Sequence, residues 1–307
     1  MFGVIAQAGV LIALGVGWRR FQPMGLSADA VRPALTSLVY IILLPALALS
    51  VLWQAELGLD TIRLVAVAVF CVLSGMALGW LVCRLLKAPP KVAGALILAA
   101  GFGNFTYLGL PILEASFGSW GRDVAIQFDL FASTPLLLTL GVFIAAAHGS
   151  GAVQADPWRE ISRVPALWAA LLGLALNLAG VPAGAWLVDV LETLAAGVIP
   201  LMLIATGLAL GNPAGWRRRL PLVLPVVAIR LLIVPFLVVW VALATGLSGE
   251  LWQAVVIEAA MPSMVLGLVI AERYGLDSHI YAETVTISTL LAALTLPLWF
   301  TLLSTAF

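Results

Sequence analysis

The sequence predicts an all-α integral membrane protein whose ten transmembrane helices form two inverted repeats of five helices. Three observations lead to this prediction: the composition, the number of long apolar segments, and the placement of basic residues in the loops. Of the 307 residues, 63% are hydrophobic and only 10% are charged, whereas ordinary soluble domains have about 25% charged residues. Because a soluble core of this size could not bury so much apolar surface, a lipid bilayer is the expected environment.

Apolar segments of membrane-spanning length follow one another along the whole chain. A transmembrane helix needs about 20 mostly apolar residues, with a range of about 17–25. In chain order, the segments close to this length are 2–18, 31–54, 62–84, 92–117, 123–147, 165–181, 185–210, 220–245, 251–273 and 280–304. We refer to them as spans one to ten.

The connections between spans are short, so we expect a single membrane domain over residues 1–307. The longest connection, 149–164, joins spans five and six and is expected to be cytoplasmic. It separates a first repeat, 1–148, from a second repeat, 165–307. Because each repeat has an odd number of spans, the second would enter the membrane upside down relative to the first.

Basic residues provide an independent test of this topology. With the N-terminus outside, the loops on the inner side contain twelve of the fifteen lysines and arginines. The outer loops contain only Arg63 and Arg122, and Arg230 lies within span eight. Since basic residues concentrate in cytoplasmic loops, both termini are expected on the periplasmic side. Arg19 and Arg20 follow the first apolar segment, whereas a signal peptide carries its charge before it, so span one is expected to be retained.

Two stretches within spans four and nine resemble each other. Residues 104–114 read NFTYLGLPILE, and residues 262–272 read PSMVLGLVIAE. At a shift of 158 they share two leucines, a glycine, an isoleucine and a glutamate. Interrupted spans at matching places in two halves are the best sequence indication of a secondary transporter's binding site.

Each of these two spans contains residues that interrupt a helix. Gly101, Gly103 and Asn104 supply the first break, and Pro262, which lacks an N–H donor, supplies the second. In an inverted repeat the breaks would meet near the membrane midplane, where the half-helices that follow would present free N–H groups and partial positive charge. That chemistry favours an anion, most simply a carboxylate. The alternative is that proline and glycine only kink two ordinary spans.

The sequence resembles the auxin efflux carrier family over essentially its whole length. The run GNFTYLGLPIL and the later Gln127 resemble the family's first crossover, and the stretch from AAMPSMVLGLVIAERYG to ISTLLAALTLPL resembles its second crossover and last span. The family includes plant auxin exporters and bacterial permeases assigned to malonate, malate and similar acids. Plant exporters carry a proline where this chain has Gly103, and many have a longer central loop than 149–164. The chain therefore looks like a compact bacterial organic-acid permease.

The resemblance implies crossed broken helices and elevator-like transport, as in the sodium/proton antiporters and bile-acid symporters. It also implies that the crossover asparagine and the adjoining helix ends bind the substrate carboxylate. A residue matching Gln127 faces that site from span five. The expected substrate-binding residues are Asn104, Phe105, Thr106, Gln127, Pro262, Ser263 and Met264.

Three ionisable residues are expected at membrane depth: Asp129, Arg230 and Glu258. Placing an arginine there costs at least about 2.5–3.5 kcal/mol, so such residues usually pair or serve a transport pathway. One interpretation is that Arg230 attracts the anion while Asp129 or Glu258 carries a coupled ion. The other is that Arg230 and Glu258 form a structural ion pair. The sequence leaves both open.

The expected function is secondary active transport of a small organic anion, a mono- or dicarboxylate, across a bacterial inner membrane. Spans one, two, six and seven would form a scaffold, and the other six would move with the site. Proton or sodium coupling and a homodimer remain open, and no cofactor, metal or nucleic acid is expected. An anion channel or uniporter is the alternative. An intramembrane enzyme is disfavoured because HExxH and GxSxG are absent and both histidines lie at membrane edges.

Overall fold

The computed structural model describes residues 2–55, 57–149, 162–210 and 216–305. In this part of the chain all regular structure is helical, which confirms the all-α prediction. Most of the expected loop 149–164 lies outside the described residues. The helices of the first half are α1 (Phe2–Phe21), η1 (Pro23–Gly25), α2 (Ala28–Leu38), η2 (Val39–Leu43), α3 (Leu44–Gln54), α4 (Leu59–Leu85), α5 (Pro90–Gly101), η3 (Phe105–Gly109), α6 (Leu110–Phe117), α7 (Trp120–Phe128), η4 (Asp129–Ser133), α8 (Thr134–Leu136), η5 (Leu137–Gly141) and α9 (Val142–His148).

The second half follows the same plan of long and interrupted helices. Its elements are α11 (Pro165–Leu178), α12 (Ala185–Ala195), α13 (Val198–Ala209), α14 (Trp216–Ala228), η6 (Ile229–Ile233), α15 (Val234–Ala244), α16 (Gly249–Ala259), α17 (Gly267–Tyr274) and α18 (Ser278–Thr305). Every expected span contains helix, and spans four and nine are each divided by a non-helical stretch, at residues 102–104 and 260–266. Span seven is also divided, between α12 and α13.

Six of the described helical segments are long and apolar enough to cross a membrane: Ala28–Gln54, Leu59–Leu85, Trp120–His148, Ala185–Ala209, Arg217–Ala244 and Ser278–Thr305. Large apolar side chains such as Trp168, Trp186 and Leu294 are exposed on the outer surface of the helices. Exposing so many apolar side chains to water would be energetically unfavourable, whereas lipid chains solvate them. These features are those of an integral membrane protein.

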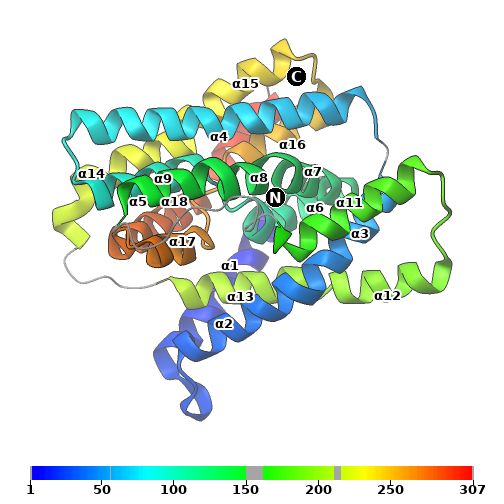
Figure 1. The fold of residues 1–307 in the computed structure, drawn as a ribbon, viewed down its shortest axis with the longest axis horizontal. Helices are drawn as coiled ribbons and strands as arrows, with labels where there is room; N and C mark the ends of the chain where they lie inside the picture. Colours follow the sequence, from blue (N-terminus) through cyan, green and yellow to red (C-terminus); the bar gives the residue numbers. More distant parts are fainter. Residues whose placement is uncertain (1, 56, 150–161, 211–215, 306–307) are drawn as a thin grey trace.

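The two halves of the chain interleave in space. In Figure 1, α13 lies beside α1 and α2, and α11 lies beside α3, so helices from both halves form one group. The long helix α4 runs along α5 and also packs against α15. The broken segments therefore lie among helices from both halves.

Five short stretches of the helices are π-helical turns, which the sequence analysis did not predict. Four of them end two residues before a proline: Pro45, Pro111, Pro135 and Pro235. Proline lacks an N–H and its ring crowds the carbonyl of the preceding turn, so a normal α-helical ladder cannot continue through it. The wider π-turn accommodates this defect without ending the helix, and such turns are frequent at functional sites.

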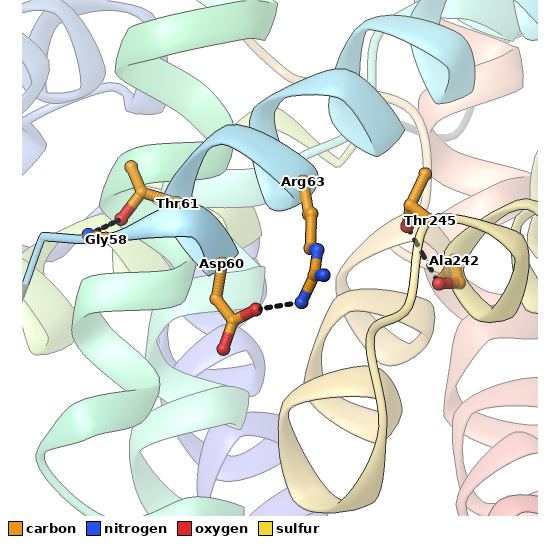
Figure 2. A network of polar contacts seen from close by, with 6 residues as sticks. All are labelled: Gly58, Asp60, Thr61, Arg63, Ala242 and Thr245. Atoms are coloured by element: carbon orange, nitrogen blue, oxygen red, sulfur yellow. Dashed lines mark hydrogen bonds and ion pairs between the residues drawn. The ribbon is translucent and has the colours of Figure 1, made fainter.

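Local polar contacts lie at the beginning of α4 and at the end of α15, which are near each other (Figure 2). Arg63 donates to Asp60 at 2.8 Å, and the backbone N–H of Gly58 donates to the hydroxyl of Thr61 at 3.4 Å. Across from them, Thr245 donates to the carbonyl of Ala242 at 2.8 Å and closes the last turn of α15. Both helix ends thus have partners for their free backbone groups.

Candidate functional site

The two breaks meet and pair through their backbones. Gly103 and Ser263 form an isolated antiparallel bridge. The N–H of Asn104 donates to the carbonyl of Pro262 at 2.7 Å, and the N–H of Met264 donates to the carbonyl of Phe102 at 3.0 Å. A backbone that leaves the helix within a bilayer must find partners inside the protein, and here each break supplies them for the other.

A small cavity, the crossover cavity, lies beside this pairing. Its volume is about 50 Å³, and its lining residues include five of the expected ones: Asn104, Phe105, Thr106, Asp129 and Met264. Asn104 is only 3% exposed, and its side-chain nitrogen has no hydrogen-bond partner in the described part of the protein. A buried amide donor without a partner is costly, so it is a natural place for an acceptor on a ligand.

Asp129 links the first break to α8, the helix that follows η4. It accepts a short hydrogen bond from the Thr106 hydroxyl and a second, 3.0 Å long, from the hydroxyl of Thr134. Thr106 is the second residue of the half-helix that begins at Phe105, whereas Asp129 begins the π-turn η4. A change in the charge of this carboxyl would therefore act directly on the first break.

The other three expected substrate-binding residues are buried but do not line the crossover cavity. Gln127 is 6% exposed and lies on α7. Pro262 provides the carbonyl that Asn104 binds. The Ser263 hydroxyl donates to the carbonyl of Ala99 at 2.7 Å, and its N–H donates to the hydroxyl of Ser288 at 3.2 Å. Ser263 thus attaches the second break to α5 and α18.

Arg230 binds the carbonyl ends of both broken helices. Its side chain is fully buried and donates to Ala259 at 2.6 Å, to Met261 at 2.8 Å and, more weakly, to Gly101 at 3.4 Å. The guanidinium also lies 5.2 Å from the centre of the Phe105 ring. Because α5 and α16 end here, the positive charge meets the negative ends of two helix dipoles. Among the described residues no ion pair joins it to Glu258.

Glu258 is buried against the half-helix of the other break. It is fully buried, and neither of its carboxyl oxygens has a hydrogen-bond partner in the described residues. Its carboxyl group lies so close to Gly109 that a methyl group at that position would overlap it. An unpartnered carboxyl at this depth is expensive and marks a candidate for binding a proton or a cation.

Two larger cavities are each lined by residues that follow the first break in the chain. The first, which we call the vestibule, has a volume of about 430 Å³ and shares Tyr40, Tyr107, Leu137, Leu138 and Leu266 with the crossover cavity. The second, the α6–α13 cavity, has a volume of about 580 Å³ and includes Glu114, Arg122 and Glu192 in its lining. The sequence analysis missed Tyr40, Tyr107 and Thr134 as lining residues. Each of these residues is followed within five positions by a proline, namely Pro45, Pro111 and Pro135. These prolines were the sequence feature from which a helix irregularity near the site could have been predicted.

Metal ligands do not gather anywhere in the described part of the chain. Nowhere in that part do three or more His, Cys, Asp or Glu side chains lie so that they could hold one ion. The polar groups at the crossover are instead amide, hydroxyl and carboxyl groups, which suit an organic ligand and a light cation.

Comparisons with known proteins find a matching family model and relatives that are named as transporters. A family model described as "Membrane transport protein" matches residues 2–300. An uncharacterized transporter of Methanothermobacter thermautotrophicus is 30% identical over 293 residues, covering 94% of each chain. The uncharacterized transporter YfdV of Escherichia coli is 22% identical, covering 77% of each chain. A protein of Oryza sativa named "Probable auxin efflux carrier component 5b" is 22% identical over 62% of this chain and 63% of its own.

Proposed function

The chain belongs to the membrane transport protein family, which is that of the auxin efflux carriers, and from this premise we propose that it is a secondary active transporter of a small organic anion. The protein is a multi-pass membrane transporter. The proposed substrate is a mono- or dicarboxylate, and the proposed membrane is a bacterial inner membrane. The observation that supports this most directly is the unpartnered amide of Asn104 at the point where two broken helices meet.

A carboxylate fits the chemistry of that point. The half-helix that begins at Phe105 has its first N–H groups free of intrahelical acceptors, and its N-terminal end carries partial positive charge. The Asn104 amide can donate to one carboxylate oxygen while the free N–H groups serve the other. Thr106 and Met264 would contact the rest of the ligand.

We further propose ten spans in two inverted repeats, with both termini periplasmic, and elevator-type alternating access. In this cycle the helices of spans three to five and eight to ten move together against the scaffold of the other four. The pairing of the two breaks supports joint movement, because Arg230 and the antiparallel bridge tie α5, η3 and α16 into one unit. In the proposed cycle, the vestibule and the α6–α13 cavity supply the two access routes.

The proposed coupling ion is a proton or a sodium ion that binds at Glu258 and Asp129. Glu258 has two carboxyl oxygens without partners and touches Gly109 within the first crossover. Asp129 binds Thr106 in the same half-helix. Occupation of either carboxyl would therefore shift the segment that presents Asn104 to the substrate.

The test is transport by the purified protein in proteoliposomes, with malonate, malate, succinate and indole acetate as substrates. We expect saturable uptake and counterflow from the wild type, and loss of about 90% or more of uptake from Asn104→Ala, since a charge-assisted hydrogen bond contributes about 1.5–3 kcal/mol. Asn177→Ala is the matched control: Asn177 donates to Trp53 and Ala55 far from the crossover cavity, so its loss should leave KM unchanged. Unchanged transport by Asn104→Ala would refute the site, and non-saturating flux would favour a channel.

A further inference from the structure

Three basic side chains lie close together where α4 turns into α5. Arg84 is in the last turn of α4, Lys87 lies in the connection, and Lys91 is the second residue of α5. All three side chains are exposed. None of them forms an ion pair with another described residue. We call residues 84–91 the basic turn.

Backbone hydrogen bonds hold the basic turn in a defined shape. The N–H of Lys87 donates to the carbonyl of Arg84 at 3.3 Å, and the N–H of Ala88 donates to the carbonyl of Cys83 at 2.9 Å. Lys87 has a left-handed backbone, with φ of 51°, which is uncommon for a residue other than glycine. Positive charges held together in this way repel one another, so an anion that binds among them would be stabilised.

Basic side chains elsewhere in the described structure have acidic partners. The ion pairs found there are Arg19–Asp29, Arg63–Asp60, Arg122–Glu114 and Arg219–Glu283. One acid, Asp277, lies beside the basic turn, since its N–H donates to the carbonyl of Lys91 at 3.2 Å. Its carboxylate instead accepts a hydrogen bond of 3.0 Å from the N–H of Ile280 at the beginning of α18. Within the described residues, the basic turn therefore has no counter-ion.

The beginning of α5 adds backbone donors to the basic turn. Pro89 precedes the helix and cannot cap it with its side chain, and Pro90, the first helical residue, has no N–H. The N–H groups of Lys91 and Val92 are thus the first donors of the helix and have no acceptor within it. Free N–H groups and the positive end of a helix dipole favour an anion such as a phosphate group.

An exposed apolar surface adjoins the basic turn on the last two turns of α4. Trp80, Leu81 and Leu85 are 48%, 44% and 70% exposed, and we call them the apolar face. The guanidinium of Arg84 lies 5.2 Å from the centre of the Trp80 ring, a contact that orients the arginine without neutralising its charge. Tryptophan is typical of the membrane–water interface. A phosphate ion would use only the basic turn, whereas a phospholipid would use the apolar face as well.

We propose that the basic turn and the apolar face together form a binding site for an anionic phospholipid. The basic turn holds the phosphate of the headgroup, and the apolar face holds the adjoining part of an acyl chain. Zwitterionic lipids have the same phosphate but carry their own cation, so the site prefers an anionic headgroup. The inference goes beyond the proposed transport function and does not rest on it, because it requires only that the protein lies in a membrane.

The test measures lipid binding to the purified protein in detergent micelles by native mass spectrometry. The probes are dioctanoyl phosphatidylglycerol, which is anionic, and dioctanoyl phosphatidylcholine, which is zwitterionic and has the same chains. We expect the wild type to bind the anionic lipid more tightly. For K87Q/K91Q we expect the Kd of that lipid to rise about 30-fold, from the attraction that each basic residue has for an anionic membrane surface.

A matched variant controls for the loss of charge. R20Q/R163Q also removes two exposed basic side chains that have no ion pair among the described residues, but they lie outside the basic turn. Its Kd for the anionic lipid should equal that of the wild type. Thermal unfolding gives a second readout, because a ligand that binds the folded state raises the unfolding temperature. Phosphatidylglycerol should raise it for the wild type and R20Q/R163Q but not for K87Q/K91Q, whose unfolding without lipid should match that of the wild type and so show that it is folded.

Other outcomes overturn the inference. If K87Q/K91Q keeps its affinity for phosphatidylglycerol, or loses no more than R20Q/R163Q does, the lipid does not bind at the basic turn. If the wild type binds both lipids equally, the site does not select an anionic headgroup. If inorganic phosphate displaces the lipid and raises the unfolding temperature as much, the basic turn is a site for free phosphate and not for a lipid. Since no transport is measured, each of these failures leaves the proposed function untouched.

Discussion

The two breaks occupy matching places in the two halves of the sequence but use their polar groups in opposite ways. In the first break, the Asn104 amide has no protein partner and lines a cavity. In the second, both polar groups of Ser263 are bonded to the protein, through Ala99 and Ser288. The first break thus has a donor available for the proposed ligand, whereas the donors of Ser263 in the second break bind the protein itself.

The backbones of the two breaks do not share this difference. Each break donates one N–H to a carbonyl of the other, from Asn104 to Pro262 and from Met264 to Phe102. The two breaks are therefore alike in their backbone hydrogen bonds and differ in how their side chains are bonded. Under the proposed function, the crossover would thus have a symmetric backbone while only the first break binds substrate through its side chain.

The substitution with the largest expected effect on this comparison is at Arg230, because its side chain donates hydrogen bonds to carbonyls at both breaks. Arg230→Met removes the donor that binds Gly101, Ala259 and Met261. We expect a loss of about 3 kcal/mol or more of stability, since each buried carbonyl left without a partner costs about 1–3 kcal/mol. Thermal unfolding of the purified protein in detergent measures it. Arg63→Gln, which breaks an exposed pair with Asp60, should change stability by less than about 1 kcal/mol.

A result in which Arg230→Met unfolds like the wild type but no longer transports would contradict the holding role. It would instead support the alternative in which this arginine attracts the anion. Arg230→Lys refines the test, because a lysine retains the charge but cannot reach several carbonyls in the fixed geometry of a guanidinium.

The sequence was sufficient to predict where the helices break but not how each polar residue is used. Glycine, asparagine and proline interrupt a helix through their own covalent structure, so Gly103, Asn104 and Pro262 could be identified from single positions. The partner of Ser263 is a carbonyl 164 residues away, and Arg230 binds carbonyls on two separate helices. Every residue has the same backbone carbonyl, so the sequence cannot show which carbonyl a side-chain donor binds. That information comes only from the folded structure.

For the same reason, the sequence could not predict the vestibule or the surroundings of Glu258. Tyr107 and Arg273 lie in different halves of the sequence and share a cavity only after the chain has folded. The close approach of Glu258 to Gly109 likewise depends on how α16 packs against η3. The membrane location, by contrast, could be predicted from composition and loop charge, because these depend on the bilayer and not on contacts between side chains.

Glu258 provides an intermediate test, of the ion that accompanies the substrate. Glu258→Gln retains the shape of the side chain but cannot change its charge. Because Asp129 remains, we expect transport to respond more weakly to pH than in the wild type, with a rate several-fold below the wild-type maximum. The charged groups that act on Glu258 are Asp129 and Arg230, and both remain in the variant. Initial uptake rates across a pH series, with and without sodium, separate proton from sodium coupling. A wild-type pH profile in the variant would exclude Glu258 as the proton site.

Ser263→Ala should have the smallest effect, and it tests the comparison most directly. The variant loses the hydrogen bond to Ala99 but keeps the backbone pairing of the break. We expect a loss of about 0.6–1.5 kcal/mol in stability, as for one hydrogen bond between membrane helices, with KM unchanged. Asn104→Ala should show the reverse, with little loss of stability and a large loss of transport, because its amide has no protein partner to lose. If Ser263→Ala instead raises KM while its unfolding temperature stays the same, the second break also binds substrate, and the division between the two breaks does not hold.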